Sequence, residues 1–300
     1  MRDFLIYICK YYHYIAAVVA LIVISRFAYS NKTLIKEQLN INLDYLYFEN
    51  KTLVKFAIFA GIFSIIIILN SIYKFNLGFK VLCCSIYSFA FCVANYESIR
   101  IFLFEKYKDI KKRVFTQGIF TWIVCPVVFS LLPLFICFLL QTSSNAQKLN
   151  TLPKISIIGY LTYCVSLIPT IVCEEILIFT VFVVAFNLLG YSKIKNAILA
   201  VIISSAYFGM LHVFVWNLQT ALTISFLHIG VGFAFLFFLD MRPLILQHLI
   251  NDWYASAILT KYVLLIKPIL IIGVTIPLFI LLFTKPLFLI KKLQRREEFS

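Results

Sequence analysis

The sequence predicts an all-α fold, a polytopic transmembrane helix bundle. Hydrophobic residues make up 62% of the 300 residues and charged residues only 13%, whereas a soluble domain is about half apolar and a quarter charged. Apolar runs recur along the chain at or above the ~20 residues that cross a bilayer. Most Lys and Arg residues lie in the short segments between these runs. We therefore expect an integral membrane protein with about nine spans.

Each span is expected from one apolar run. In chain order the runs cover residues 11–28, 53–73, 79–96, 119–140, 155–189, 196–215, 218–239, 243–259 and 262–284. No small-residue cleavage site follows the first run, so we expect a retained helix there. The fifth run would be about 52 Å long at ~1.5 Å per residue, too long for one straight span. It is expected to be strongly tilted, kinked near Pro169, or divided into two pieces.

Polar segments between the runs indicate which side each loop faces. Residues 29–52 are polar but keep enough Leu, Ile and Tyr for a helix on the membrane surface. Residues 100–113 and the C-terminus are basic, which favours anionic lipids of the cytoplasmic leaflet. With nine spans, most of the 27 basic residues fall on the side that holds segments 29–55, 98–118, 190–195, 240–243 and the C-terminus. The C-terminus is therefore expected in the cytoplasm.

Two features of the composition exclude other classes. The net charge of +14 is spread over loops between apolar runs, which predicts membrane topology and not nucleic-acid binding. None of the eight cysteines forms a CxxC pair, so they are expected to be small packing residues and neither disulfides nor zinc ligands. The chain has no internal repeat. We treat it as one domain with three regions: N-terminal helices in 1–145, a core in 146–265, and a final helix with a basic tail in 266–300.

Two adjacent carboxylates, Glu174 and Glu175, lie in the middle of the fifth apolar run. One acidic side chain at the centre of a spanning helix costs roughly 2.5–3.5 kcal/mol, so a functional role is expected for the pair. Adjacent helical side chains point about a third of a turn apart. We expect one carboxylate to face a wet cavity and the other to hold a neighbouring helix.

Three histidines and one aspartate occur in the later apolar runs. His212 follows Phe208 by four residues and Asp252 follows His248 by four, so each pair shares a helical face. His228 has no patterned partner and is expected to make a structural hydrogen bond between helices. Together with the glutamates, His212, His248 and Asp252 are the groups needed to activate water and stabilise an oxyanion.

Counting from the turns predicts which of these groups meet. Glu174 and His212 are each 19 residues from Lys193, so an antiparallel hairpin would bring them level. His248 is only a few residues past the turn at 240–243. To reach His212, the helix at 218–239 is expected to tilt, or to break at Gly230 or Gly232.

Three short motifs in this order resemble the CPBP family of intramembrane proteases, also called CAAX proteases or the Abi family. Its motifs EExxxR, FxxxH and HxxxN/D are similar to segments 174–179, 208–212 and 248–252. The resemblance covers roughly residues 150–260. It implies an intramembrane endopeptidase that cleaves a membrane-embedded or lipidated peptide or protein in a bacterial plasma membrane.

 Both the order and the spacing of the three motifs agree with those of the family.

The resemblance also implies roles for individual residues. Glu174 with His212 would activate a water molecule, and His248 with Asp252 or Asn251 would stabilise the oxyanion, while Glu175 supports the site. No cofactor is expected, because the chain has no HExxH-like pair. A metal-assisted route stays open, since Glu174, His212, His248 and Asp252 are also suitable zinc ligands.

One position departs from the first motif and keeps other functions open. The Arg that ends the family's motif is Phe179 here. This change favours a second hypothesis, a catalytically impaired homologue that acts as a bacteriocin-immunity or scaffold membrane protein. A third hypothesis is a proton-coupled transporter that uses Glu174 and Glu175 as its proton relay.

Overall fold

The computed structural model describes residues 29, 32–100, 102, 154–190, 192–267 and 269. This part of the chain is helical and contains no strand, as the all-α prediction requires. Its helices are α2 (Lys32–Asp44), α3 (Asn50–Tyr73), α4 (Leu77–Arg100), α7 (Ile157–Leu188), α8 (Lys193–Leu211), α9 (Leu218–Phe238), α10 (Arg242–Ser256) and the short 3-10 helix η2 (Ala257–Leu259).

Four helices are long and apolar enough to cross a membrane: α3, α4, α7 and α8. They coincide with the predicted spans at 53–73, 79–96, 155–189 and 196–215, so the chain is a membrane protein. Helix α9 also matches its predicted run, 218–239. The spans predicted at 11–28 and 119–140, most of the one at 262–284, and nearly all of both basic segments lie outside the described residues.

Helix α10 differs from the span expected at 243–259. It has 15 residues, fewer than the ~20 that cross a bilayer. Pro243 lies in its first turn, where the missing N–H costs no helical hydrogen bond. The helix continues only into the short η2 segment. Alone, α10 is too short to span.

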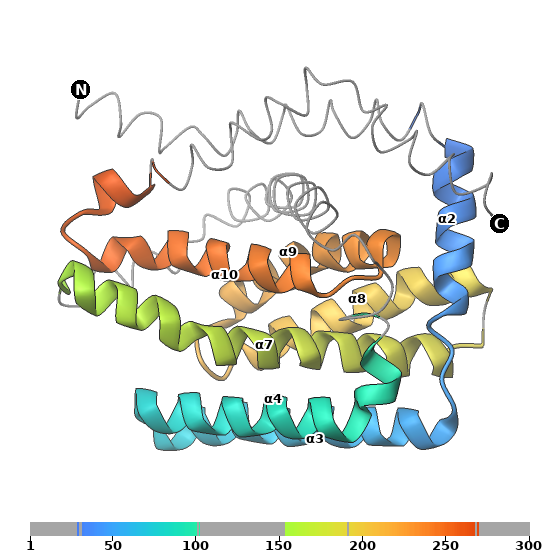
Figure 1. Cartoon of the computed structure of the whole chain (residues 1–300), viewed down its shortest axis with the longest axis horizontal. Coiled ribbons are helices and arrows are strands. Elements are labelled where there is room, and N and C mark those ends of the chain that lie inside the picture. Colours follow the sequence, from blue (N-terminus) through green and yellow to red (C-terminus); the bar gives the residue numbers. More distant parts are fainter. Residues whose placement is uncertain are drawn as a thin grey trace.

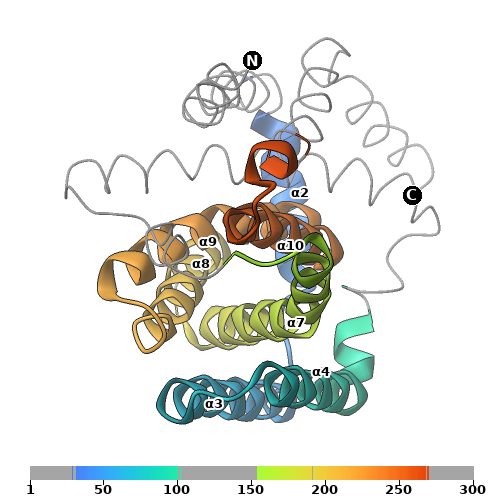
Figure 2. The ribbon, with the colours of Figure 1, turned by 90° about the vertical axis from the view of Figure 1, so that its left-hand side faces the viewer.

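Helix α7 is the centre of the molecule. Figure 2 shows it between the α3/α4 pair on one side and α8, α9 and α10 on the other, and α7 contacts α3, α4, α8 and α10. It is one helix of 32 residues that contains Pro169, so the fifth apolar run is not divided into two pieces. At ~1.5 Å per residue it is about 48 Å long, and Figure 1 shows that its path bends.

The outer faces of α3 and α4 are apolar and exposed. Large hydrophobic side chains that are between 38% and 72% exposed repeat along both helices. They include Val54, Ile58, Ile62, Ile65, Leu69, Leu82, Ile86, Phe89 and Val93. An apolar surface of this extent favours contact with lipid over water.

The segments predicted to share one side of the membrane meet at one end of the bundle. In Figure 1, α2 lies at this end, roughly perpendicular to α3, α4 and α7. Asn42 of α2 donates to the carbonyl of Leu236 at 2.8 Å, and Asp44 pairs with Lys193 at the start of α8. Residues 42–44, the α7–α8 turn and the end of α9 therefore lie together.

One hydrophobic core joins the early and late helices. A cluster of aromatic rings lies where they meet, and the ring of Phe179 on α7 is 5.7 Å from Phe56 of α3, 5.3 Å from Phe102 and 5.7 Å from Phe235 of α9. Buried residues of this core run from Leu43 to Leu244. The described part of residues 1–145 therefore packs with the predicted core region as one unit.

The cysteines of the described part behave as packing residues. Cys83, Cys84, Cys92, Cys164 and Cys173 are all free thiols. Cys173 on α7 donates to the carbonyl of Cys84 on α4 at 3.0 Å. This agrees with the prediction that they are not disulfides.

Candidate functional site

A hydrogen bond between α7 and α10 is the centre of the candidate site. Nδ1 of His248 lies 2.7 Å from Oε1 of Glu175, and both side chains are buried. The side chain of Glu175 is only 3% exposed. A buried carboxylate needs partners to offset the loss of water, and His248 provides one. Glu175 is therefore the carboxylate that holds a neighbouring helix.

The other ring nitrogen of His248 faces two more carboxylates. Nε2 lies 3.6 Å from Oε2 of Glu174 and 3.9 Å from Oδ1 of Asp252. These distances exceed a direct hydrogen bond but suit a bridging water. Ionised carboxylates only accept hydrogen bonds, so a ring protonated on both nitrogens would donate one N–H to Glu175 and direct the other toward Glu174 and Asp252. Glu174 is 16% exposed and Asp252 35%, so this side of the ring is more open than the side that faces Glu175.

Hydrogen bonds near the start of α7 fix α10 in this position. Trp253 donates its indole N–H to the carbonyl of Cys164 at 3.1 Å, and Tyr160 donates its hydroxyl to the carbonyl of Trp253 at 2.7 Å. Ser156 begins α7 by accepting from the N–H of Gly159. Because Trp253 is five residues past His248, these bonds hold the imidazole opposite the glutamates.

The predicted pairing of Glu174 with His212 is not formed. No hydrogen bond or ion pair joins them among the described residues, and His212 instead places Nδ1 3.0 Å from the carbonyl oxygen of Phe208. Helix α7 ends at Leu188 and α8 begins at Lys193, so Glu174 is 14 residues inside the hairpin and His212 is 19. The prediction counted the turn residues as part of the helix, so the two positions looked level. They are in fact offset by about 7 Å along the helix axis.

Phe208, one helical turn before His212, connects the histidines. Its ring centroid lies 4.6 Å from that of His212, 4.4 Å from His228 and 6.3 Å from His248. His212 is therefore beside the cluster, one helical turn beyond it. Asn251, the predicted alternative to Asp252, is exposed.

His228 belongs to the cluster, although only a structural hydrogen bond between helices was predicted for it. Its ring lies 5.3 Å from that of His248, and its buried Nδ1 has no hydrogen-bond partner among the described residues. The proximity of His228 to His248 could have been predicted from the short turn between Phe238 and Arg242, because this turn places the middle of α9 beside the first half of α10. Spacing within one helix, as in FxxxH, does not detect such a partner.

Helix α9 does not break to assemble the site. It runs without interruption from Leu218 to Phe238, so the expected break at Gly230 or Gly232 is wrong. A Cβ on Gly232 would lie 2.8 Å from Val201, and one on Gly209 would lie 1.9 Å from the Ser225 hydroxyl. These glycines let α8 and α9 pack closely, which brings Phe208 against His228.

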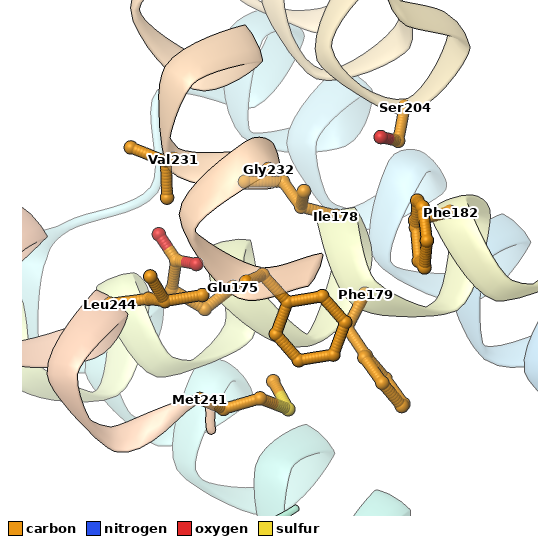
Figure 3. A pocket seen from close by; sticks show the side chains of 10 residues that line it. Glu175, Ile178, Phe179, Phe182, Ser204, Val231, Gly232, Met241 and Leu244 are labelled. Atoms are coloured by element: carbon orange, nitrogen blue, oxygen red, sulfur yellow. The ribbon is translucent and has the colours of Figure 1, made fainter. Parts of the chain in front are cut away.

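A narrow, mostly apolar pocket borders the site. Figure 3 shows the Glu175 carboxylate among apolar side chains of this pocket, which include Val231 and Leu244. Phe179 also lines it, at the position where the CPBP motif EExxxR has Arg. No Lys or Arg lines this pocket, so Glu175 meets apolar walls on this side and His248 on the other.

The predicted zinc set is not the group that the fold assembles. Glu174, His212, His248 and Asp252 do not form a set with metal-ligand spacing in the described part of the chain. Glu175, His228 and His248 do, with one ligand atom from each lying within 4.8 Å of the others. Only His248 belongs to both sets.

Comparison of the chain with models of protein families, with curated proteins and with solved structures finds no match. The site is therefore interpreted from its own geometry.

Proposed function

We propose that the chain is an intramembrane endopeptidase of the CPBP type, which cleaves a membrane-embedded or lipidated peptide or protein. One observation carries the proposal: His248 lies between Glu175 on Nδ1 and Glu174 and Asp252 on Nε2, in the middle of apolar helices. Placing three carboxylates around one imidazole inside a membrane has a high cost in free energy. Peptide hydrolysis would use each group.

The proposed roles follow from exposure and hydrogen bonding. Glu174, which water can reach, takes a proton from the attacking water. His248, with Nδ1 bonded to Glu175, directs Nε2–H at the oxyanion that forms on the peptide carbonyl. Glu175 orients the ring and supports its positive charge, as carboxylates behind catalytic histidines do. Asp252 holds the water or the ring from the open side.

The proposal extends to topology. We infer about nine spans in the plasma membrane of a bacterium, with the C-terminus in the cytoplasm and anionic lipids at that face. The meeting of α2, the α7–α8 turn and the end of α9 at one end of the bundle supports a shared side for these segments.

Cleavage is tested by comparing membrane proteins in a bacterial host that expresses the wild-type chain or Glu174→Gln. New protein N-termini within or next to spans are identified by mass spectrometry. We expect a set of termini that depends on the wild type and is lost with Glu174→Gln and with His248→Ala. Glu97→Gln is the matched control, because Glu97 is an exposed glutamate paired with Arg100 on α4. Identical termini for wild type and Glu174→Gln would refute the hydrolase.

Phe179 supports a second function, a homologue that binds and protects a membrane partner without cleaving it. The residue is buried among aromatic rings and offers no charge to a substrate. In that case, protection of the host would survive Glu174→Gln and His248→Ala but fail when α7 is destabilised.

A further inference from the structure

We propose that Glu175, His228 and His248 bind a divalent transition-metal ion, for which Zn²⁺ is the natural probe. The three side chains come from α7, α9 and α10, and all are buried. One oxygen and two nitrogen ligand atoms lie within 4.8 Å of one another. Zinc binds such ligands at about 2.0–2.2 Å, so small side-chain movements would close the set around an ion.

The unpartnered nitrogen of His228 points to a missing ligand. Its Nδ1 is buried and makes no hydrogen bond in the described part of the protein, and the whole residue is 7% exposed. A buried polar atom without a partner costs about 1–3 kcal/mol. The neighbouring rings of Phe208 and His248 leave little freedom for His228 to find another partner. The His228 ring offers one of its nitrogens to an ion beside Glu175 and His248.

Charge in the cluster also favours a cation. Three carboxylates, from Glu174, Glu175 and Asp252, lie within 3.9 Å of the His248 ring. Within the described ranges no Lys or Arg forms an ion pair with them. A divalent ion would supply the positive charge that membrane-buried carboxylates need.

The ligand types select the class of metal. Two imidazoles and one carboxylate suit Zn²⁺ and related transition metals, whereas Mg²⁺ and Ca²⁺ prefer oxygen ligands alone. The ion would take the place of the proton between His248 Nδ1 and Glu175, so binding releases protons. Nε2 of His248 would keep its contacts with Glu174 and Asp252, which orient the metal-bound ring. The partly exposed Asp252 marks the side from which an ion can enter.

Metal content tests the site directly and does not depend on the proposed proteolysis. The full chain is purified in detergent micelles, stripped with a chelator, and dialysed against micromolar Zn²⁺ or Co²⁺. Metal per chain is measured by plasma mass spectrometry, and the visible spectrum of bound Co²⁺ reports a low-coordinate site. We expect one tightly bound ion per chain, and binding that weakens as pH falls.

Matched variants locate the ion. Glu175→Gln and His228→Gln should weaken binding at least tenfold, on the order of the loss seen when even outer-sphere partners are removed. His212→Gln, a neighbouring histidine outside the set, should retain the ion. Circular dichroism and gel filtration of every variant show whether it is folded.

No bound ion in the folded wild type, or equal loss in His212→Gln and His228→Gln, would overturn the site. A wild-type chain that binds the ion but produces no termini beyond those seen with Glu174→Gln would reject the protease and leave the metal site standing.

Discussion

His248 and Glu175 are joined by a 2.7 Å contact between Nδ1 and Oε1, across 73 positions of sequence. This contact ties the short helix α10 to the central helix α7 and leaves Nε2 facing Glu174 and Asp252. It also assigns the two adjacent glutamates different surroundings, since Glu175 is the more deeply buried.

The first prediction separates the two glutamates by stability. Glu175→Ala should destabilise the protein by about 1–3 kcal/mol, because the buried Nδ1 of His248 loses its partner. Glu174→Ala should cost clearly less, since Glu174 makes no direct hydrogen bond in the described structure and water reaches it. Thermal unfolding in detergent, followed by tryptophan fluorescence, measures both. Equal losses would show that the contact with Glu175 contributes little.

The second prediction concerns position 179, where the CPBP motif EExxxR has Arg and this chain has Phe. Phe179→Arg would place a cation among the rings of Phe56, Phe102 and Phe235. We expect a loss of several kcal/mol in the free energy of unfolding, as for an unpaired buried charge.

Phe179→Leu is the control, because it removes the ring but adds no charge, and it should be milder. Denaturation in detergent compares the two variants. If Phe179→Arg were as stable as the wild type, the guanidinium would have found a carboxylate, and the motif could be restored in this chain.

The third prediction tests the close approach of α8 and α9. Gly209→Ala places a Cβ 1.9 Å from the Ser225 hydroxyl and 2.5 Å from the carbonyl of Ala221. We expect a loss of roughly 1–3 kcal/mol from overpacking, and a displaced Phe208.

Gly61→Ala on α3 is the matched control, since nothing lies within 4 Å of its Cβ. This change should be neutral or stabilise by up to about 1 kcal/mol through helix propensity. Thermal unfolding of both variants decides the point. A harmless Gly209→Ala would mean that the two helices can separate without loss.

The sequence predicted the fold class and much of its layout. Hydropathy located the four helices that can cross a membrane, because a bilayer demands long apolar helices whatever their partners. The cost of charge in lipid marked Glu174 and Glu175 before any contact was known. Apolar length did not predict that α10 stops at Ser256, since that end depends on its packing with α7.

The partners within the site depended on tertiary structure. Sequence spacing paired Glu174 with His212, but the turn between Leu188 and Lys193 shifts their helices by about 7 Å. It also gave His228 only a structural role, although close packing of α8 on α9 brings it to the cluster.

By itself, the sequence determined that this protein is a helical membrane protein with costly polar groups in its middle helices, because hydropathy and charge act locally along the chain. Only the tertiary structure decided that Glu175 meets His248 and that His228 joins them. Those contacts depend on where helices end and how they rotate against each other, which no local pattern specifies.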